Sequence, residues 1–179
     1  MESRYDKEPT IPISGLDMEI WRGYHHISQV LRRSMEGKQK FVMTVECYPT
    51  TRVDEIVRGL ELGLNPVKVI DVEQAAKPKD RNEAMIERYL TEDRVFGYMA
   101  PFSIADFYDQ DQIKNLQSEV EAVTDGLVVV IGTGASLVTS GNLLIYADMA
   151  RWEIPTAISY SRIRKLARVQ PLGRHFAQI

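Results

Sequence analysis

The stretch KFVMTVECYPTTRVDE, residues 40–55, decides the fold that this sequence predicts. Its first half is a short apolar and β-branched run, residues 41–45, which favours a buried strand because turn residues bound it. The capping-box pattern Thr51-x-x-Asp54 then predicts the start of a helix. One face of that helix is marked by apolar side chains at helical spacing, namely Val53, Ile56, Val57 and Leu60. The stretch therefore indicates a strand, a tight turn and a helix in direct succession.

The same alternation of helix and strand continues along the chain. Short apolar runs at residues 67–72, 127–131 and 143–147 predict three further strands. Helical periodicity predicts further helices over residues 16–35, 80–90 and 110–123, the second of them capped by Asp80 with Glu83. Short apolar strands separated by helices predict a three-layer α/β fold, with a mostly parallel sheet and helices on both faces.

Length and composition describe one globular domain followed by a basic segment. The 179 residues include 44% hydrophobic and 26% charged side chains, which suits a single domain with one core. Residues 155–179 contain five Lys and Arg and no acidic residue, whereas residues 1–154 contain 17 basic and 25 acidic residues. We therefore expect an α/β domain over residues 1–154. The segment 155–179 is either a basic helix on an acidic body or the truncated or frame-shifted end of a longer coding sequence.

Charge and residue types argue against several kinds of partner and site. A formal net charge of −3 argues against a nucleic-acid partner, and the short apolar runs argue against a membrane span. The first ten residues show no hydrophobic signal region, and the single cysteine, Cys47, excludes an internal disulfide. The three histidines, His25, His26 and His175, form no zinc-binding spacing with it. We expect a cytoplasmic protein.

The turn after the first strand is a candidate site, because ligands of parallel sheets bind beyond the carboxyl ends of the strands. A Walker-type phosphate loop needs glycines, a lysine and a hydroxyl, and this turn supplies only Thr50 and Thr51. Pro49 removes a backbone donor, Glu46 repels an anion, and Arg52 replaces part of the lysine charge. The turn is therefore either purely structural or a weak phosphate site made by Thr50, Thr51 and Arg52.

Other positions carry less specific signals. Asp148 follows the fourth strand, where an acid either holds a hydrated magnesium ion or caps the next helix. Arg94 and Arg151 are candidate phosphate ligands, although solvated arginines are common. Cys47 is either a small buried residue or a thiol with a lowered pKa near a helix start. The motif GTGAS, residues 132–136, has fewer glycines than a dinucleotide fingerprint.

Four motifs, taken in order, resemble a known family. They are YDKEPTIPI (5–13), KFVMTVECYPTTRVDEI (40–56), LTEDRVFG (90–97) and LLIYADMARWEI (143–154). Residues 4–154 thereby resemble the N-terminal part of long bacterial proteins described as class I mannose-6-phosphate isomerases, in which such a domain precedes a cupin-type isomerase domain. The resemblance implies zinc only in that missing cupin domain, no cofactor within this chain, and no isomerase activity of this chain alone.

A second, more remote likeness concerns topology. VVVIGTGASL (128–137), then LLIYAD (143–148) and an arginine-bearing helix, are similar to a uridine-kinase-type P-loop fold. The likeness implies a P-loop-kinase-like topology. It also implies a degenerate phosphate loop, because ECYPTTRVDE (46–55) stands where the glycine-rich loop would be.

Two functions remain open. Our preferred hypothesis is a non-catalytic, kinase-like N-terminal domain of a mannose-6-phosphate isomerase-type carbohydrate-metabolism protein. It would bind a sugar phosphate or nucleotide weakly, or only mediate assembly with a cupin-domain partner or with copies of itself. The alternative is a divergent ATP-dependent phosphotransferase, a nucleoside or sugar kinase that uses magnesium with the nucleotide. Its residues would be Thr50, Thr51 and Arg52 for phosphate, Asp148 for magnesium, and Arg94 or Arg151 for transition-state charge.

Overall fold

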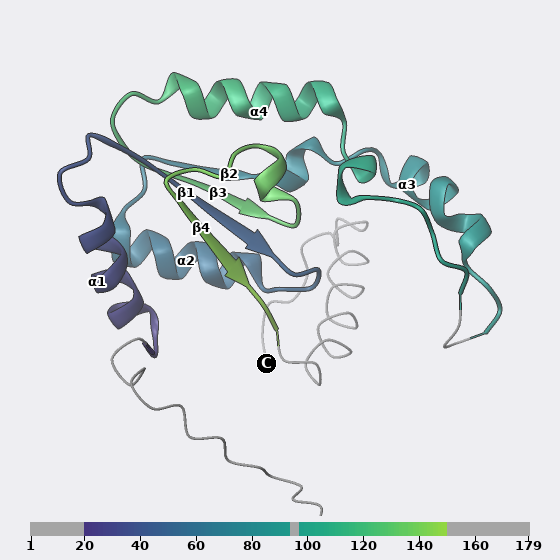
Figure 1. The fold of residues 1–179 in the computed structure, drawn as a ribbon, viewed down its shortest axis with the longest axis horizontal. Helices are drawn as coiled ribbons and strands as arrows, with labels where there is room; N and C mark the ends of the chain where they lie inside the picture. Colours follow the sequence, from purple (N-terminus) through teal and green to yellow (C-terminus); the bar gives the residue numbers. More distant parts are fainter. Residues whose placement is uncertain (1–19, 94–96, 150–179) are drawn as a thin grey trace, which may run out of the picture.

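The computed structural model describes residues 20–93 and 97–149 (Figure 1). Within them, helices and strands alternate as α1 (Tyr24–Met35), β1 (Lys40–Cys47), α2 (Val53–Leu64), β2 (Lys68–Asp71), α3 (Lys79–Ile86), α4 (Gln110–Ala122), β3 (Gly126–Gly132) and β4 (Leu143–Ala147). Short 3₁₀ helices connect them, namely η1 (Val72–Ala75), η2 (Glu87–Tyr89), η3 (Ile104–Phe107) and η4 (Ala135–Leu137). The predicted strands at residues 41–45, 67–72, 127–131 and 143–147 correspond to β1, β2, β3 and β4.

The described strands form one parallel sheet in the order β2-β3-β1-β4. The register pairs Lys40 with Gly126 and Glu46 with Gly132 between β1 and β3, and Met43 with Leu143 between β1 and β4. Nearly every residue of the two inner strands is buried, which explains why both read as continuous apolar runs. The predicted α/β fold with a parallel sheet is confirmed.

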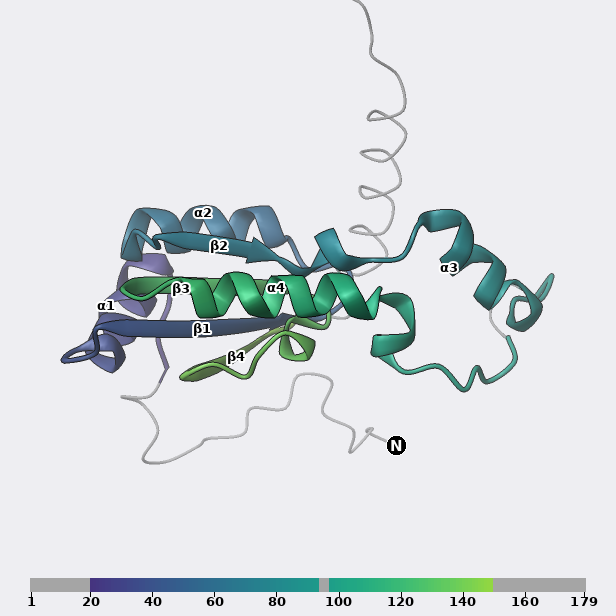
Figure 2. The same cartoon turned by 90° about the horizontal axis from the view of Figure 1, so that it is seen from above.

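Helices cover both faces of this sheet, so the predicted three layers are present (Figures 1 and 2). On one face α4 packs its buried stripe of Ile113, Leu116 and Val120 against Val128 and Val130 of β3. On the other face lie α1 and α2, whose buried side chains Leu31 and Leu60 join the alternate residues of β1 and β3 in a second core cluster. The alternation of side chains along each inner strand thus supplies one core per face.

Two predicted helix starts are wrong. The N-cap of α2 is Arg52 rather than Thr51, and no side chain makes a cap hydrogen bond there. The N-cap of α3 is Pro78, again without a side-chain cap bond, so Asp80 lies inside the helix. By contrast α4 begins as expected, with the Asp109 carboxylate accepting from the amides of Asp111 and Gln112.

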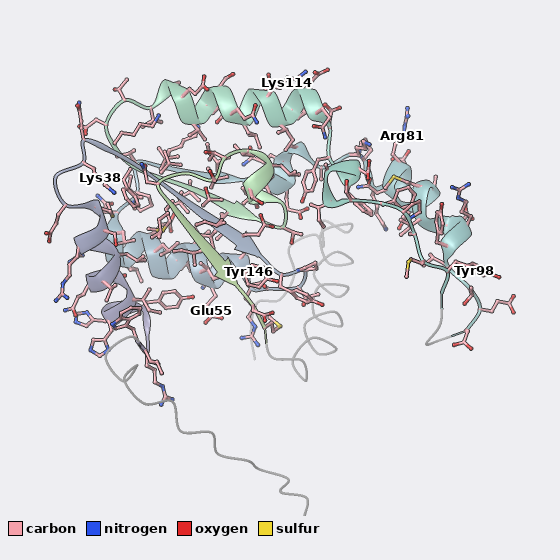
Figure 3. The ribbon with its side chains drawn as sticks, viewed as in Figure 1. Lys38, Glu55, Arg81, Tyr98, Lys114 and Tyr146 are labelled. Atoms are coloured by element: carbon pink, nitrogen blue, oxygen red, sulfur yellow. The ribbon has the colours of Figure 1, made fainter. Side chains whose placement is uncertain are left out.

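The segment between η1 and α4 extends away from the sheet (Figures 1 and 2). Its base is closed by the antiparallel bridge between Ala76 and Tyr108. Farther out, α3 has no buried residue, and the side chains of Arg81 and Tyr98 lie well away from the sheet (Figure 3). This extension therefore rests on few tertiary contacts.

Parts of the predictions fall outside the described residues. These are residues 16–19 of the predicted first helix, the basic segment 155–179, and the residues Arg94 and Arg151. Of the helix predicted over residues 16–35, the described part is helical from Tyr24 to Met35, and residues 20–23 are not helical. None of the helices in residues 20–93 and 97–149 has both the length and the apolar character needed to cross a membrane.

Candidate functional site

The carboxyl ends of β1, β3 and β4 meet at one edge of the sheet, where a parallel fold places its ligands. Three segments gather there. They are the turn after β1, the loop leading from β3 into η4, and the residues after β4.

In the turn after β1, the threonine hydroxyls contact other groups of the protein. The Thr51 hydroxyl donates to the backbone oxygen of Tyr48 at 2.6 Å, and it lies 3.3 Å from the backbone oxygen of Ala147 at the end of β4. The amide of Tyr48 also donates to the Ala147 oxygen, at 2.8 Å. These bonds join the turn to β4, which is why Thr51 does not cap α2.

Thr50 occupies a strained place in the same turn. Its φ of 85° is in the left-handed region, which a β-branched residue rarely adopts and which costs about 1–3 kcal/mol. Its hydroxyl lies 3.9 Å from the sulfur of Met149. The turn is held in this shape by its bonds to β4, and it contains no glycine that would let its amides wrap around a phosphate.

Arg52 faces solvent beside an acid. Its guanidinium lies 3.6 Å from the carboxylate of Glu55, and both side chains are more than half exposed. Such a surface pair contributes little to stability and leaves Arg52 free to move. Thr50, Thr51 and Arg52 are therefore neighbours in the chain, but their hydrogen-bond donors do not converge on one point.

At this edge the hydrogen-bond donors that converge on one point belong to the loop after β3, and the Glu46 carboxylate accepts from them. The Glu46 carboxylate accepts from the amide of Gly134 at 2.5 Å and from the amide and hydroxyl of Ser136 at 2.9 and 2.6 Å. Gly134 has φ 85° and sits against the Ile104 and Tyr108 side chains, so the loop conformation requires glycine there. GTGAS thus forms an anion cradle that an internal carboxylate occupies.

The surroundings of this cradle are acidic. Tyr108 is buried, and its hydroxyl donates to the backbone oxygen of Thr133 in the same loop. Burial raises the pKa of the Tyr108 phenol, and the negative charges of Glu73, Glu46 and Asp71 raise it further. Those three carboxylates give this edge of the sheet a negative potential, which disfavours a phosphate group.

Cys47 is a small buried residue, which is one of the two interpretations given by the sequence. It is 2% exposed, and burial raises the pKa of its thiol to about 11, with smaller contributions from the charges of Glu46 and Asp71. A thiol that stays protonated is a poor nucleophile, so the alternative of an activated cysteine is wrong.

Asp148 is exposed after β4, and its carboxylate accepts from the amide of Met149 at 2.7 Å. Residues 20–93 and 97–149 contain no group of three His, Cys, Asp or Glu side chains able to hold a metal ion. A single carboxylate could still share a hydrated magnesium ion with the phosphates of a nucleotide. Arg94 and Arg151, the other candidates for this chemistry, lie outside the described residues.

The sequence reasoning missed what Glu46 does. Glu46 counted only as repulsion for an anion, whereas it binds a loop that lies 88 and 90 residues away along the chain. One signal could have revealed this contact. Glu46 and Gly132, the first glycine of GTGAS, both lie at the end of an apolar strand. If the two strands pair, their ends are neighbours, and in the structure Glu46 does pair with Gly132.

Residues 23–171 match the family model of a domain of unknown function, DUF8485, so this chain belongs to that family. No curated protein matches the chain. No solved structure matches it either.

Proposed function

We propose that this member of the DUF8485 family is a non-catalytic, kinase-like domain of a cytoplasmic, mannose-6-phosphate isomerase-type protein of carbohydrate metabolism. In this proposal the chain carries out no phosphoryl transfer and holds no cofactor of its own. It binds a sugar phosphate or a nucleotide weakly, or mediates assembly with a cupin-type, zinc-binding partner domain or with further copies of itself.

The observation that carries the proposal is the Glu46 carboxylate in the loop after β3. Phosphoryl transfer depends on backbone donors, a cation and magnesium gathered around the transferred group. Here the amides of Gly134 and Ser136 already bind a fixed negative charge, and a phosphate could use them only by displacing it. Displacement would leave the Glu46 carboxylate beside the phosphate, with electrostatic repulsion between them.

The turn after β1 supports the same conclusion. Its Thr51 hydroxyl is bonded to Tyr48 and Ala147, and Arg52 lies beside Glu55, so neither is arranged around a common ligand. The alternative phosphotransferase would require the turn to rearrange on binding a nucleotide. Asp148 is exposed beyond β4, which would leave its carboxylate accessible to a magnesium ion in that alternative.

A thermal-shift series separates the two functions. The protein is heated with ATP, UTP, mannose 6-phosphate or fructose 6-phosphate, each with and without magnesium. A ligand that binds only the folded state raises Tm according to the ratio of its concentration to its Kd. We expect no magnesium-dependent shift with either nucleotide and at most a small shift with a sugar phosphate.

The control variant is Asp148→Asn, which removes the carboxylate that the alternative phosphotransferase would use for magnesium. A magnesium-dependent rise in Tm with ATP or UTP that disappears in Asp148→Asn would overturn the proposal in favour of a phosphotransferase. A magnesium-dependent rise that persists in Asp148→Asn would also contradict the expected result, and it would show that the nucleotide binds with magnesium held elsewhere.

A further inference from the structure

β4 is the outermost strand on one side of the described sheet, next to β1. Among residues 20–93 and 97–149 no strand pairs with its outer side (Figure 2). An edge strand presents a row of unpaired backbone N–H and C=O groups, to which a strand of another chain can bind. The outer side of β4 is therefore a candidate surface for a partner.

The two edges of the sheet differ in how they are protected. Natural proteins guard an edge strand with charged side chains, proline, a bulge or a very short strand. β2, at the other edge, has only four residues and carries a charged residue at each end, Lys68 and Asp71. β4 has the sequence LLIYA, without a charge or a proline. Of the two edges, β4 is thus the one that lacks the usual protection against pairing.

The side chains of β4 divide between the two faces of the sheet. Leu143, Ile145 and Ala147 pack against the core cluster beneath α1 and α2. Leu144 and Tyr146 lie on the opposite face, where they are 54% and 62% exposed, and Figure 3 labels Tyr146 on this strand. These two large side chains form a continuous apolar strip along the open edge, which is the kind of surface that a partner covers.

The backbone groups of the same two residues face the open side. The backbone oxygen of Ala147 accepts from the amide of Tyr48 at 2.8 Å, so this oxygen points towards the end of β1. A strand bonds to one neighbour through alternate residues, which assigns the N–H and C=O groups of Ile145 to β1 as well. The N–H and C=O groups of Leu144 and Tyr146 therefore point outward, away from β1.

Antiparallel pairing of two β4 strands satisfies these groups. If a two-fold axis passes beside Ile145, Leu144 of each copy stands opposite Tyr146 of the other. The outward N–H and C=O groups of these residues then form four hydrogen bonds, and each leucine side chain packs beside a tyrosine ring. Asn142 stands opposite Asp148 in the same register, so the two Asp148 carboxylates do not face each other. The strand is thus complementary to itself in hydrogen bonding, apolar contact and charge.

The extent of this pairing indicates a weak dimer. It closes at two copies, because each β4 edge is used once and the edges left at the ends of the joined sheet are the charged β2 strands. Five residues a side are far fewer than the roughly 20–30 residues of a standard stable interface. We therefore expect a Kd on the order of 100 µM rather than a permanent dimer.

We propose that β4 is a self-association surface, through which two copies of this chain join their sheets in antiparallel pairing about Ile145. Leu144 and Tyr146 supply both the hydrogen-bonding groups and the apolar contacts. The pairing surface stands on the structure of β4, and its use in assembly rests on the proposed function, in which the chain associates with further copies of itself.

The first test is sedimentation velocity of the full chain from about 20 µM to about 1 mM, where we expect a monomer–dimer equilibrium. In ¹⁵N NMR spectra over the same range, the amide signals of Leu144 and Tyr146 should change most, because these amides gain hydrogen-bond partners. A chain that stays monomeric at about 1 mM would overturn the inference. Another segment of this chain, or a different protein, would then have to cover β4.

Charge substitutions test the register. Leu144→Glu and Tyr146→Lys should each weaken dimerisation by at least about 5-fold, because each change occurs twice in a symmetric interface. Mixing the two variants places the new glutamate of one copy opposite the new lysine of the other, so the mixture should dimerise more strongly than either variant alone. The matched control Leu62→Glu, at a 90% exposed leucine of α2, should change the Kd by less than about 2-fold.

Two further outcomes would overturn the inference. A dimer that neither Leu144→Glu nor Tyr146→Lys weakens would use another surface. A dimer that both variants weaken, but that mixing does not restore, would rule out antiparallel pairing about Ile145. The Tm of each variant checks that it is folded, and the dilution series on the unmodified chain decides the case if a variant is not.

Failure of the proposed function looks different from failure of this inference. It would appear as a magnesium-dependent rise in Tm with ATP or UTP, which reports on the strand ends rather than on the outer side of β4. The concentration at which the chain dimerises, and its response to Leu144→Glu and Tyr146→Lys, would not depend on that result.

Discussion

Cys47 and Tyr108 are buried side chains that both carry a proton at neutral pH. Burial is the main reason that the pKa of each is raised, and the charges of Glu46 and Asp71 raise both further. The two residues lie on opposite faces of the sheet, since Cys47 belongs to the cluster beneath α1 and α2 and Tyr108 to the cluster beneath α4. Both cores are therefore sensitive to alkaline pH.

The first prediction concerns this alkaline sensitivity. The thiol of Cys47 has a pKa of about 11 in the folded state, whereas 9.0 is its ordinary value. Between these values the unfolded state binds fewer protons than the folded state, so the free energy of unfolding falls as pH rises through this window. The stabilising contribution of the protonated thiol is fully present below about pH 9 and is lost by about pH 11.

Urea unfolding of the protein and of Cys47→Ala at several pH values from about 8 to about 11 measures this effect. The variant should be less stable near pH 8, because it leaves a small cavity. Its stability should fall less steeply as pH rises, so the difference between the two proteins should shrink towards pH 11. Tyr108 remains in both proteins and accounts for the residual slope. Identical slopes in the two proteins would show that the thiol does not titrate as expected.

At the scale of single residues, sequence reasoning worked where only burial mattered. Cys47 could be read as a small buried residue because it ends an apolar strand. The role of Glu46 could not be read in the same way, because its partners Gly134 and Ser136 approach it only after β1 and β3 have paired. The local sequence pattern predicts that a charged residue ends the strand, but it does not identify the backbone amides that bind this charge.

At the scale of elements, the contact between α1 and α2 depends on glycine within a helix. Glycine is normally unfavourable in a helix interior by about 1 kcal/mol relative to alanine. At Gly59 the close Tyr24 ring explains the exception, since a Cβ atom would lie 2.3 Å from it. Packing between the helices therefore outweighs the propensity within one of them.

Gly59→Ala gives the second prediction. The gain in helix propensity should be outweighed by displacement of Tyr24 or of α1, with a net loss of about 1–3 kcal/mol in the free energy of unfolding. The nearby control is Leu62→Ala, which should cost less than about 0.5 kcal/mol because Leu62 is 90% exposed. Chemical denaturation of both variants provides the comparison, and a more stable Gly59→Ala would mean that the helices are not packed so closely.

Helix starts show why element boundaries were harder to predict than the elements themselves. The pattern Thr51-x-x-Asp54 has the residues of a capping box, but the Thr51 hydroxyl bonds to Tyr48 and lies within reach of Ala147 instead. Those partners belong to the turn and to a strand 96 residues later in the chain. A tertiary contact thus replaces the local one, whereas the Asp109 carboxylate makes the local cap by accepting from the amides of Asp111 and Gln112.

At the scale of the molecule, the three-layer arrangement follows from physical rules that the sequence satisfies. Continuous apolar runs at β1 and β3 demand cover on both faces, and the intervening helical segments supply it. For the extension between η1 and α4 the sequence predicts only the helix over residues 80–90. Its position away from the sheet left no periodic signal, because α3 buries no residue and so needs no apolar stripe.

The last prediction concerns how stability is distributed over the whole chain. Most residues of β1 and β3 are buried in the middle of the sheet, so their amide protons should exchange with solvent only when the whole domain unfolds. The eight residues of α3 are too few for a stable isolated helix, and none of them is buried. They should exchange by local opening, at a free energy lower than that of β3 by at least about 2 kcal/mol.

Native-state hydrogen exchange, followed by NMR on a dilute sample, measures both values. Repeating it at higher protein concentration tests whether the exposed side chains of the extension meet another copy, as in the homo-oligomer that is one of the proposed assemblies. Protection of α3 that rises with concentration would place this extension in such an interface. Protection equal to that of β3 in the dilute sample would contradict the prediction, because it would require α3 to be packed into the cooperative core of one molecule.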